Sequence, residues 1–300
     1  NKAYLEQSRD YITALLRQLM TQIAPDGQEC LDGTRFLDWP SNSNKDAIAA
    51  GLQALMVWGM RVGVEFAELF EDRQLSNDCK AAEKKLVKAA SKVYKKFLAS
   101  CPAPDAPGSK QVTALMTITG LIDAPKADKE FLSINGAQGF STFYGYYMLE
   151  AMAMAGNYQG ALDVIREYWG AMIDLGATSF WEDFDINWIP NAAPIDELVP
   201  EGKKDIHGDC GAYCYVGFRH SLCHGWASGP TSWLSRHILG VEVIEPGCRQ
   251  VRITPHLGDL QWVKGTFPTP YGELQIYHEK QANGNVISEV KAPKGVSVIK

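Results

Sequence analysis

The spacing of apolar residues changes near residue 240, and this change constrains the fold more than any other feature of the sequence. Before that point apolar residues recur at three- and four-residue steps, as in Ile12, Leu16 and Leu19, which predicts helices with one buried stripe. Beyond it, short runs such as QVRITP and GELQIYHEK are separated by turn residues, which predicts β-strands. We therefore expect a helical domain at 1–240 and a small antiparallel β domain at 241–300.

The helical part divides into segments joined by loops. Their expected ranges are about 12–23, 48–64, 79–99, 111–122, 126–134, 140–156, 158–176 and 228–239. Helices of this size in antiparallel succession favour helical hairpins over alternating βαβ units.

Several residues predict where the elements begin and end. Asn42 or Asn44 is placed to cap the helix that carries Ile48, and Ser228 is placed to cap the last helix, with Pro230 in its first turn. The segment ANGN predicts a hairpin turn between two of the β-strands.

Composition excludes some classes of function. A net charge of −6 argues against a nucleic-acid-binding surface, which needs a basic patch. No uninterrupted apolar run approaches the roughly 18 residues that span a membrane, so we expect no membrane partner. No GxGxxG, P-loop or CxxCH motif occurs, so we expect no nucleotide, flavin or haem cofactor.

The first residues, NKAYLEQSRDYITALLRQL, read as the middle of a helix rather than as a secretory signal. We therefore expect the chain to be cut from a longer polypeptide. Its localisation stays open, and would be periplasmic or extracellular if the parent carries a signal peptide.

Cysteine and histidine concentrate between residues 207 and 224. The set is His207, Cys210, Cys214, His220, Cys223 and His224. Structural zinc sites usually match two closely spaced pairs of ligands, and only Cys210 and Cys214 form such a pair here. Buried thiols and hydrogen-bonded histidines are the favoured interpretation, and we expect no metal.

The stretch GATSFWEDFDINW, residues 176–188, places Glu182 after Trp181, just before about 35 residues of loop. Loops this long inside a domain are usually functional or disordered, and the aromatic content argues against disorder. Hydrolysis of a glycoside uses two carboxyl groups, and sugar sites favour aromatic walls. Glu182 is therefore a candidate catalytic carboxylate, with Asp183 and Asp185 as nearby negative charges; the alternative is a solvated loop acid.

Two further stretches combine polar and aromatic residues. FLDWP contains Asp38 and Trp39, and SLCHGWASGP contains His224 and Trp226 beside small residues. Taken singly, the tryptophan of the first stretch is expected to pack under its loop, and the histidine of the second to be a structural, hydrogen-bonded residue.

FLDWP, GATSFWE and SLCHGWASGPTSWLSRHILGVEVIEPGCRQVRITP occur together and in this order. The combination resembles the bacterial α-L-rhamnosidases of glycoside hydrolase family 78, and the resemblance continues through LQWVKGTFPTPYGELQI. It implies a mainly α fold with a β tail: the C-terminal part of an (α/α)6 six-hairpin barrel, followed by a small antiparallel β-sandwich. It also implies a rhamnose-containing carbohydrate substrate, from which terminal α-L-rhamnose is removed with inversion.

The same resemblance suggests roles for individual residues. Glu182 would be the general base that activates water, Trp39 would line the rhamnose pocket, and His224 would hydrogen-bond sugar hydroxyls. Asp38, Trp181 and Trp226 are substrate-binding candidates because they neighbour those positions.

The sequence departs from the family pattern in two places. The family's general acid lies in an Asp- and Arg-rich segment upstream of the DW stretch, and residues 1–35 contain no counterpart. Cys223 stands where the family has Asn. About eight helices are predicted, fewer than six hairpins contain, so we expect a C-terminal part that carries the base but not the acid, with an N-terminal part of the same polypeptide missing.

Other functions stay open at this point. The chain could be a carbohydrate-binding protein without turnover, or another (α/α)6 glycosidase or lyase. A lyase of acidic sugars would need a pocket lined by Arg or Lys, whereas the suspected site is rich in acidic residues and Trp. This comparison favours a neutral sugar.

Overall fold

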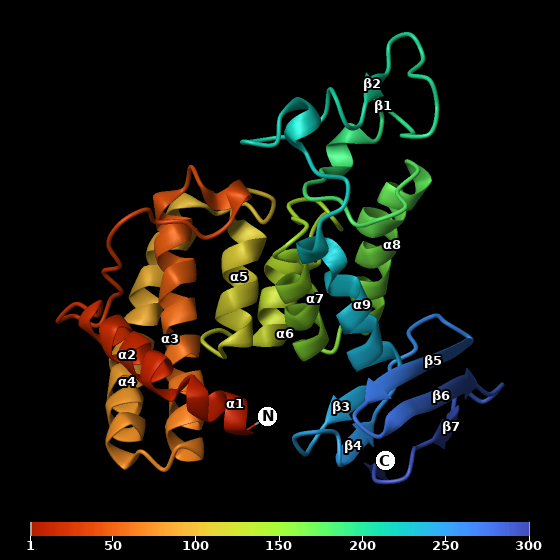
Figure 1. Cartoon of the computed structure of the whole chain (residues 1–300). Helices are drawn as coiled ribbons and strands as arrows, with labels where there is room; N and C mark the ends of the chain where they lie inside the picture. The colour runs from red at the N-terminus through yellow and green to blue at the C-terminus, as the bar shows by residue number, and fades with distance from the viewer. Residues whose placement is uncertain (1, 300) are drawn as a thin grey trace. The chain divides into compact units, whose positions relative to one another are not determined.

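The computed structural model describes residues 2–299, and these divide into two units between Phe140 and Ser141. Figure 1 shows the course of the chain. Helices make up the regular elements of the first unit, the second unit combines helices with strands, and six of the described strands lie between Val241 and Ile299. The mainly α architecture with a β tail is therefore confirmed. The predicted domain boundary at residue 240 lies within the second unit and stays a prediction.

The first unit is entirely helical in its regular elements. They are α1 (Lys2–Gln7), α2 (Arg9–Thr21), a 3-10 helix (Trp39–Ser41), α3 (Lys45–Leu69), α4 (Arg73–Ser100), α5 (Ser109–Ile118), α6 (Ala124–Ala127) and a π-helical turn (Asp128–Leu132).

Helices α3 and α4 form an antiparallel hairpin because only residues 70–72 connect them (Figure 1). Of the two predicted caps, Asn42 and Asn44, it is Asn44 that caps α3: its side-chain oxygen accepts the N–H groups of Asp46 and Ala47 at 3.1 and 3.0 Å. Side chains of α2, α3 and α4 share one core that includes Met60 and Leu86. The hairpin thus buries the apolar stripes that the sequence predicted.

Helix α3 has the length and apolar composition that a membrane-spanning helix needs. This was not predicted, because charged and polar residues interrupt its apolar run. Of its most apolar window, 56% is buried inside the protein. Core helices of globular proteins show the same combination, because they are covered on most sides.

The loop that leads from α2 to the 3-10 helix is fastened to the α3–α4 hairpin by one buried amide. Gln53 Nε2 donates to the carbonyls of Gly27 and Leu86 at 3.1 and 2.8 Å, and Gln53 Oε1 accepts the N–H of Glu29 at 2.7 Å. The Glu29 carboxylate in turn pairs with Arg35. The backbone of this loop therefore obtains buried partners that a strand or helix would otherwise supply.

The second unit begins with two helices and continues through a long irregular segment. Its helical elements are α7 (Gly145–Met154), α8 (Tyr158–Asp174), three 3-10 helices (Ile186–Trp188, Gly217–Arg219 and Gly225–Ser228), α9 (Gly229–Trp233) and a π-helical turn (Leu234–Ile238). Two-residue strands β1 (Ala192–Ala193) and β2 (Lys204–Asp205) pair in parallel within the irregular segment.

Several predicted helix ends in this unit are confirmed and others are wrong. Gly156 and Gly176 follow α7 and α8 in the left-handed region, with φ of +78° and +89°, where glycine stops a helix without strain. Helix α7 starts at Gly145, later than predicted. Ser228 occupies the predicted N-cap position of α9, but its side chain makes no capping hydrogen bond: the hydroxyl donates to the carbonyl of Gly225 at 2.6 Å instead of accepting from α9.

The β tail consists of two three-stranded sheets. They contain β3 (Val241–Val243), β4 (Gln250–Ile253) and β8 (Ser297–Ile299), and β5 (Trp262–Thr269), β6 (Gly272–Lys280) and β7 (Val286–Lys291). Leu274 and Ile276 of β6 join Val251 of β4 in a common core. The predicted ANGN turn joins β6 to β7. One pairing differs from the predicted antiparallel arrangement, because β4 and β8 are parallel.

Candidate active site

Glu182 follows α8 and lies where two distant segments of the second unit pair through their backbones. Its N–H donates to the carbonyl of Ser221 at 2.9 Å, and the N–H of His224 donates to the carbonyl of Phe180 at 2.7 Å. The N–H of Ser221 also donates to Glu182 Oε2 at 2.9 Å. The carboxylate is therefore oriented by the backbone of the facing segment.

The main-chain carbonyl of Glu182 is held from two further positions. Thr142 Oγ1 donates to it at 2.6 Å, and Trp226 Nε1 donates to it at 2.7 Å. Thr142 is 3% exposed. Backbone and side chain of the candidate base are thus both fixed, which limits the conformations available to the carboxylate.

The second carboxylate oxygen of Glu182 faces a histidine. His224 Nδ1 lies 3.5 Å from Glu182 Oε1, and the side-chain exposures are 32% for His224 and 13% for Glu182. The imidazole also packs on Trp226, with ring centroids 4.3 Å apart. The fold therefore brings together Glu182, His224 and Trp226, which the sequence predicted as site residues. Of Glu182 and His224, the histidine has the more exposed side chain.

Aromatic rings continue from Trp226 along the same surface. Phe143 stacks on Trp226 with centroids 5.8 Å apart and planes at 28°, and Tyr215 meets Trp226 edge-on at 6.2 Å. Phe143 is 39% exposed. Phe143 and Thr142 were not predicted as site residues, because they precede α7 and share no motif with the acidic stretch.

Trp181 and Asp185 have local structural contacts in this region. The Trp181 ring is fully buried and meets Phe184 edge-on at 5.8 Å, so it supports the turn that carries Glu182. The Asp185 carboxylate accepts the N–H of Asn187 at 2.9 Å and begins a 3-10 helix. A direct role of Trp181 in substrate binding stays a prediction.

His220 is fully buried and contacts the acidic stretch. Its Nε2 accepts the N–H of Asp183 at 3.1 Å. Burial lowers the pKa of His220, because the charged imidazolium loses hydration. A neutral ring suits its role as an acceptor, so this histidine stabilises the backbone next to Glu182.

Asp38 and Trp39 belong to the first unit. Asp38 is 5% exposed, and Gln111 Nε2 donates to its Oδ2 at 3.3 Å. Trp39 meets Phe36 edge-on at 5.0 Å. Close packing is possible there because Gly108, with φ of +85°, has no side chain: a Cβ would lie 2.7 Å from that of Ser41. Substrate binding by Asp38 and Trp39 stays a prediction.

The cysteines and histidines of 207–224 do not gather around a common point. All seven cysteines are free thiols. Within residues 2–299, no three His, Cys, Asp or Glu side chains are arranged to hold a metal ion. Cys210 is a buried thiol, and burial raises its pKa. The His207 ring packs edge-on against Phe218, with centroids 5.1 Å apart.

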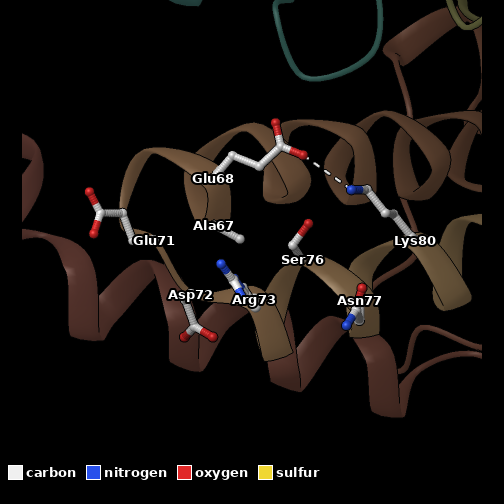
Figure 2. A pocket seen from close by; sticks show the side chains of 8 residues that line it. All are labelled: Ala67, Glu68, Glu71, Asp72, Arg73, Ser76, Asn77 and Lys80. Carbon is white, nitrogen blue, oxygen red and sulfur yellow. Dashed lines mark hydrogen bonds and ion pairs between the residues drawn. The ribbon is translucent and has the colours of Figure 1, made fainter.

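A separate hollow lies in the first unit at the turn between α3 and α4, with a volume of about 560 Å³ (Figure 2). Its lining residues are charged or polar apart from Ala67, and Glu68 and Lys80 among them form an ion pair at 3.1 Å. Glu71 lies at one end of the group of lining side chains, and Asn77 and Lys80 lie at the other (Figure 2). No aromatic side chain lines this hollow, so it lacks the wall expected of a sugar site.

Comparison with known proteins agrees with this description. Residues 240–299 match the family model of the bacterial alpha-L-rhamnosidase C-terminal domain. The whole chain superposes on solved α-L-rhamnosidases, with 99% of its residues covered in each case. The resemblance to α-L-rhamnosidases is confirmed.

Three solved structures illustrate the similarity. A family 78 rhamnosidase of Bacillus sp. GL1 has a TM-score of 0.72 at 21% identity, and an α-L-rhamnosidase of Streptomyces avermitilis, solved with L-rhamnose, has 0.68 at 18%. An α-L-rhamnosidase of Aspergillus terreus has 0.72 at 16%. At these identities the likeness shows a shared fold, and its occurrence in a fungus means that the fold is not confined to bacteria.

The chain spans about a third of these rhamnosidases, covering 31%, 27% and 34% of their lengths. Among curated proteins, no sequence matches it significantly.

Proposed function

We propose that the chain is the C-terminal part of an inverting α-L-rhamnosidase in which Glu182 is the general base. The observation that carries this proposal is the fixed carboxylate: one oxygen accepts the N–H of Ser221 at 2.9 Å, and the other faces His224 at 3.5 Å. A general base must hold an ionised oxygen within hydrogen-bond reach of its proton donor. Glu182 Oε1 is the oxygen available for that contact.

In the proposed reaction Glu182 takes a proton from a water molecule. The water attacks the anomeric carbon of rhamnose from the face opposite the leaving oxygen, which inverts the configuration. Such enzymes separate their two carboxyl groups by roughly 6.5–9.5 Å to admit this water. We propose that the general acid, which protonates the leaving oxygen, lies outside these 300 residues.

The residues around Glu182 have complementary proposed roles. His224 is accessible enough to hydrogen-bond a sugar hydroxyl, and the stacked rings of Trp226 and Phe143 present apolar faces on which the C–H groups of a sugar can pack. Asp38 and Trp39 are proposed as further substrate-binding residues on the family resemblance alone.

The test is hydrolysis of an aryl α-L-rhamnoside by the polypeptide that contains these 300 residues, beside its Glu182→Gln variant. Removing a general base lowers turnover by about 10²–10⁴-fold, and the amide of Gln keeps the size of the side chain. Glu197→Gln is the matched control, because Glu197 is an exposed acid of the same loop. The anomer first released, followed by NMR, reports inversion.

Two outcomes contradict the proposal. Normal turnover of the Glu182→Gln variant removes Glu182 from the role of base. Release of the retained anomer removes the single-displacement mechanism. Rhamnose binding without turnover in the unmodified protein favours the alternative of a carbohydrate-binding protein.

A further inference from the structure

The second sheet of the β tail has one face in the core and one face outside. Alternate residues of β5 and β6 point to opposite faces, so Leu274 and Ile276 are buried whereas Trp262, Lys264 and Gln275 lie on the outer face. A purely structural outer face needs only polar side chains. This one carries two large aromatic rings.

The two rings stack on each other. Trp262 of β5 and Tyr277 of β6 have centroids 6.5 Å apart and planes at 29°. The Trp262 side chain is 60% exposed. In the register of the sheet Tyr277 pairs with Lys264 on one side and with Glu289 on the other, so the aromatic pair continues directly into a polar row.

This face forms a hollow of about 820 Å³. Its lining includes both rings together with Lys264, Gln275 and Lys291. Such a volume lies within the range of small-ligand sites. The side chains offer hydrogen-bond donors and acceptors of several kinds next to an apolar platform, which is the combination that a sugar ring requires.

The outer face carries no excess of cations. Lys264 and Lys291 supply two positive charges, and the outward Glu273, Glu279 and Glu289 supply three negative charges. A binding site for a uronate or another anion would show an excess of cations. The charges therefore argue against an anionic ligand, and the hydrogen-bonding side chains beside the two rings favour a neutral one.

We propose that the outer face of the β5–β6–β7 sheet is a carbohydrate-binding surface for a neutral pyranose within an oligosaccharide or polysaccharide. The ring stacks on Trp262 and Tyr277, and its hydroxyls bond to Lys264, Gln275 and Glu289. This surface is independent of Glu182, so it goes beyond the proposed rhamnosidase function and does not depend on it.

The test is affinity electrophoresis of the 300-residue chain in gels that contain one of four neutral polysaccharides: galactomannan, xyloglucan, arabinogalactan or laminarin. A gel with polygalacturonate measures binding to a polyanion. We expect retardation in at least one neutral gel and a dissociation constant about tenfold or more higher for Trp262→Ala, as for loss of a central aromatic contact. Trp262→Phe should recover part of the affinity.

Tyr11→Ala is the matched control, because Tyr11 is also exposed, at 72%, and lies in the first unit. Circular dichroism melts establish that Trp262→Ala remains folded. Glu182→Gln should bind the polysaccharide unchanged, which separates this site from the proposed catalytic one.

Four results would overturn the proposal. They are the absence of retardation in all four neutral gels, retardation by polygalacturonate alone, equal affinities of Trp262→Ala and the unmodified chain, or equal losses in Trp262→Ala and Tyr11→Ala. A dimer in solution that Trp262→Ala dissociates would assign the face to a second copy of the chain instead.

Discussion

The carbonyl of Glu182 accepts two side-chain hydrogen bonds, and removing them one at a time measures how firmly the candidate base is held. Thr142→Val keeps the shape of the side chain but deletes the 2.6 Å bond, and Trp226→Phe deletes the 2.7 Å bond while keeping an aromatic ring. Each neutral hydrogen bond contributes about 1 kcal/mol to the free energy of unfolding. In either single variant the carbonyl keeps one donor.

The double variant differs, because the carbonyl then loses both donors. Leaving a buried acceptor unpaired costs about 1–3 kcal/mol beyond the bond itself. The two changes should therefore destabilise the protein by more than their sum, with a coupling free energy of about 1–2 kcal/mol. The smaller ring of Phe cancels in this cycle, since it is present in both Trp226→Phe variants.

Urea unfolding followed by far-ultraviolet circular dichroism provides the four free energies. Thr142→Ser removes a buried methyl group, which costs about 0.8 kcal/mol, but keeps the hydroxyl, so its effect should add to that of Trp226→Phe. Additive effects, within about 0.5 kcal/mol, would refute the reasoning that the two donors share one acceptor.

Two further predictions concern stability. Gln53→Met should lower the free energy of unfolding by roughly 3 kcal/mol, because Gln53 is fully buried and serves two carbonyls and the N–H of Glu29; urea midpoints measure it, and the exposed Gln74→Met, unchanged, is the control. Burial lowers the pKa of His220 and of His278, so the unfolded state binds more protons near its pKa of about 6.5. The contribution of the two neutral histidines to the free energy of unfolding is fully present above about pH 6.5, the unfolded pKa. It is lost as the pH falls from there through their lower pKa values in the folded protein. Melting temperatures between pH 8 and 5 should fall with pH, and less so in His278→Gln; a pH-independent melt would contradict this.

The predictable part of the fold is the part governed by local spacing. The helices, the hairpin at α3 and α4, the Asn44 cap and the glycine stops after α7 and α8 all depend on residues close in sequence. Ser228 shows where this fails. Its position before Pro230 is that of a cap, yet its hydroxyl bonds to Gly225, because the preceding residues form a 3-10 turn that presents a nearer acceptor.

The candidate site was only partly predictable, for a different physical reason. Glu182, His224 and Trp226 stand in recognisable stretches, so the family resemblance pointed to them together. The contacts that hold Glu182 come from Thr142 and Ser221, about 40 residues away on either side. No periodicity or spacing in a single sequence encodes such long-range hydrogen bonds, since a threonine and a serine serve many roles.

The backbone bonds around Glu182 make the position of its carboxylate independent of the loop that follows it. The loop leaves the site after Glu182 and returns to it at Ser221. Backbone hydrogen bonds between these two residues, and between Phe180 and His224, hold the two ends of the loop together. Loop length affects closure entropy only weakly, and exposed loop residues tolerate change. Residues such as Leu198, 95% exposed, are therefore free to vary without moving the carboxylate. Because its two ends are held together, the loop can change in sequence while Glu182, Ser221 and His224 keep their geometry.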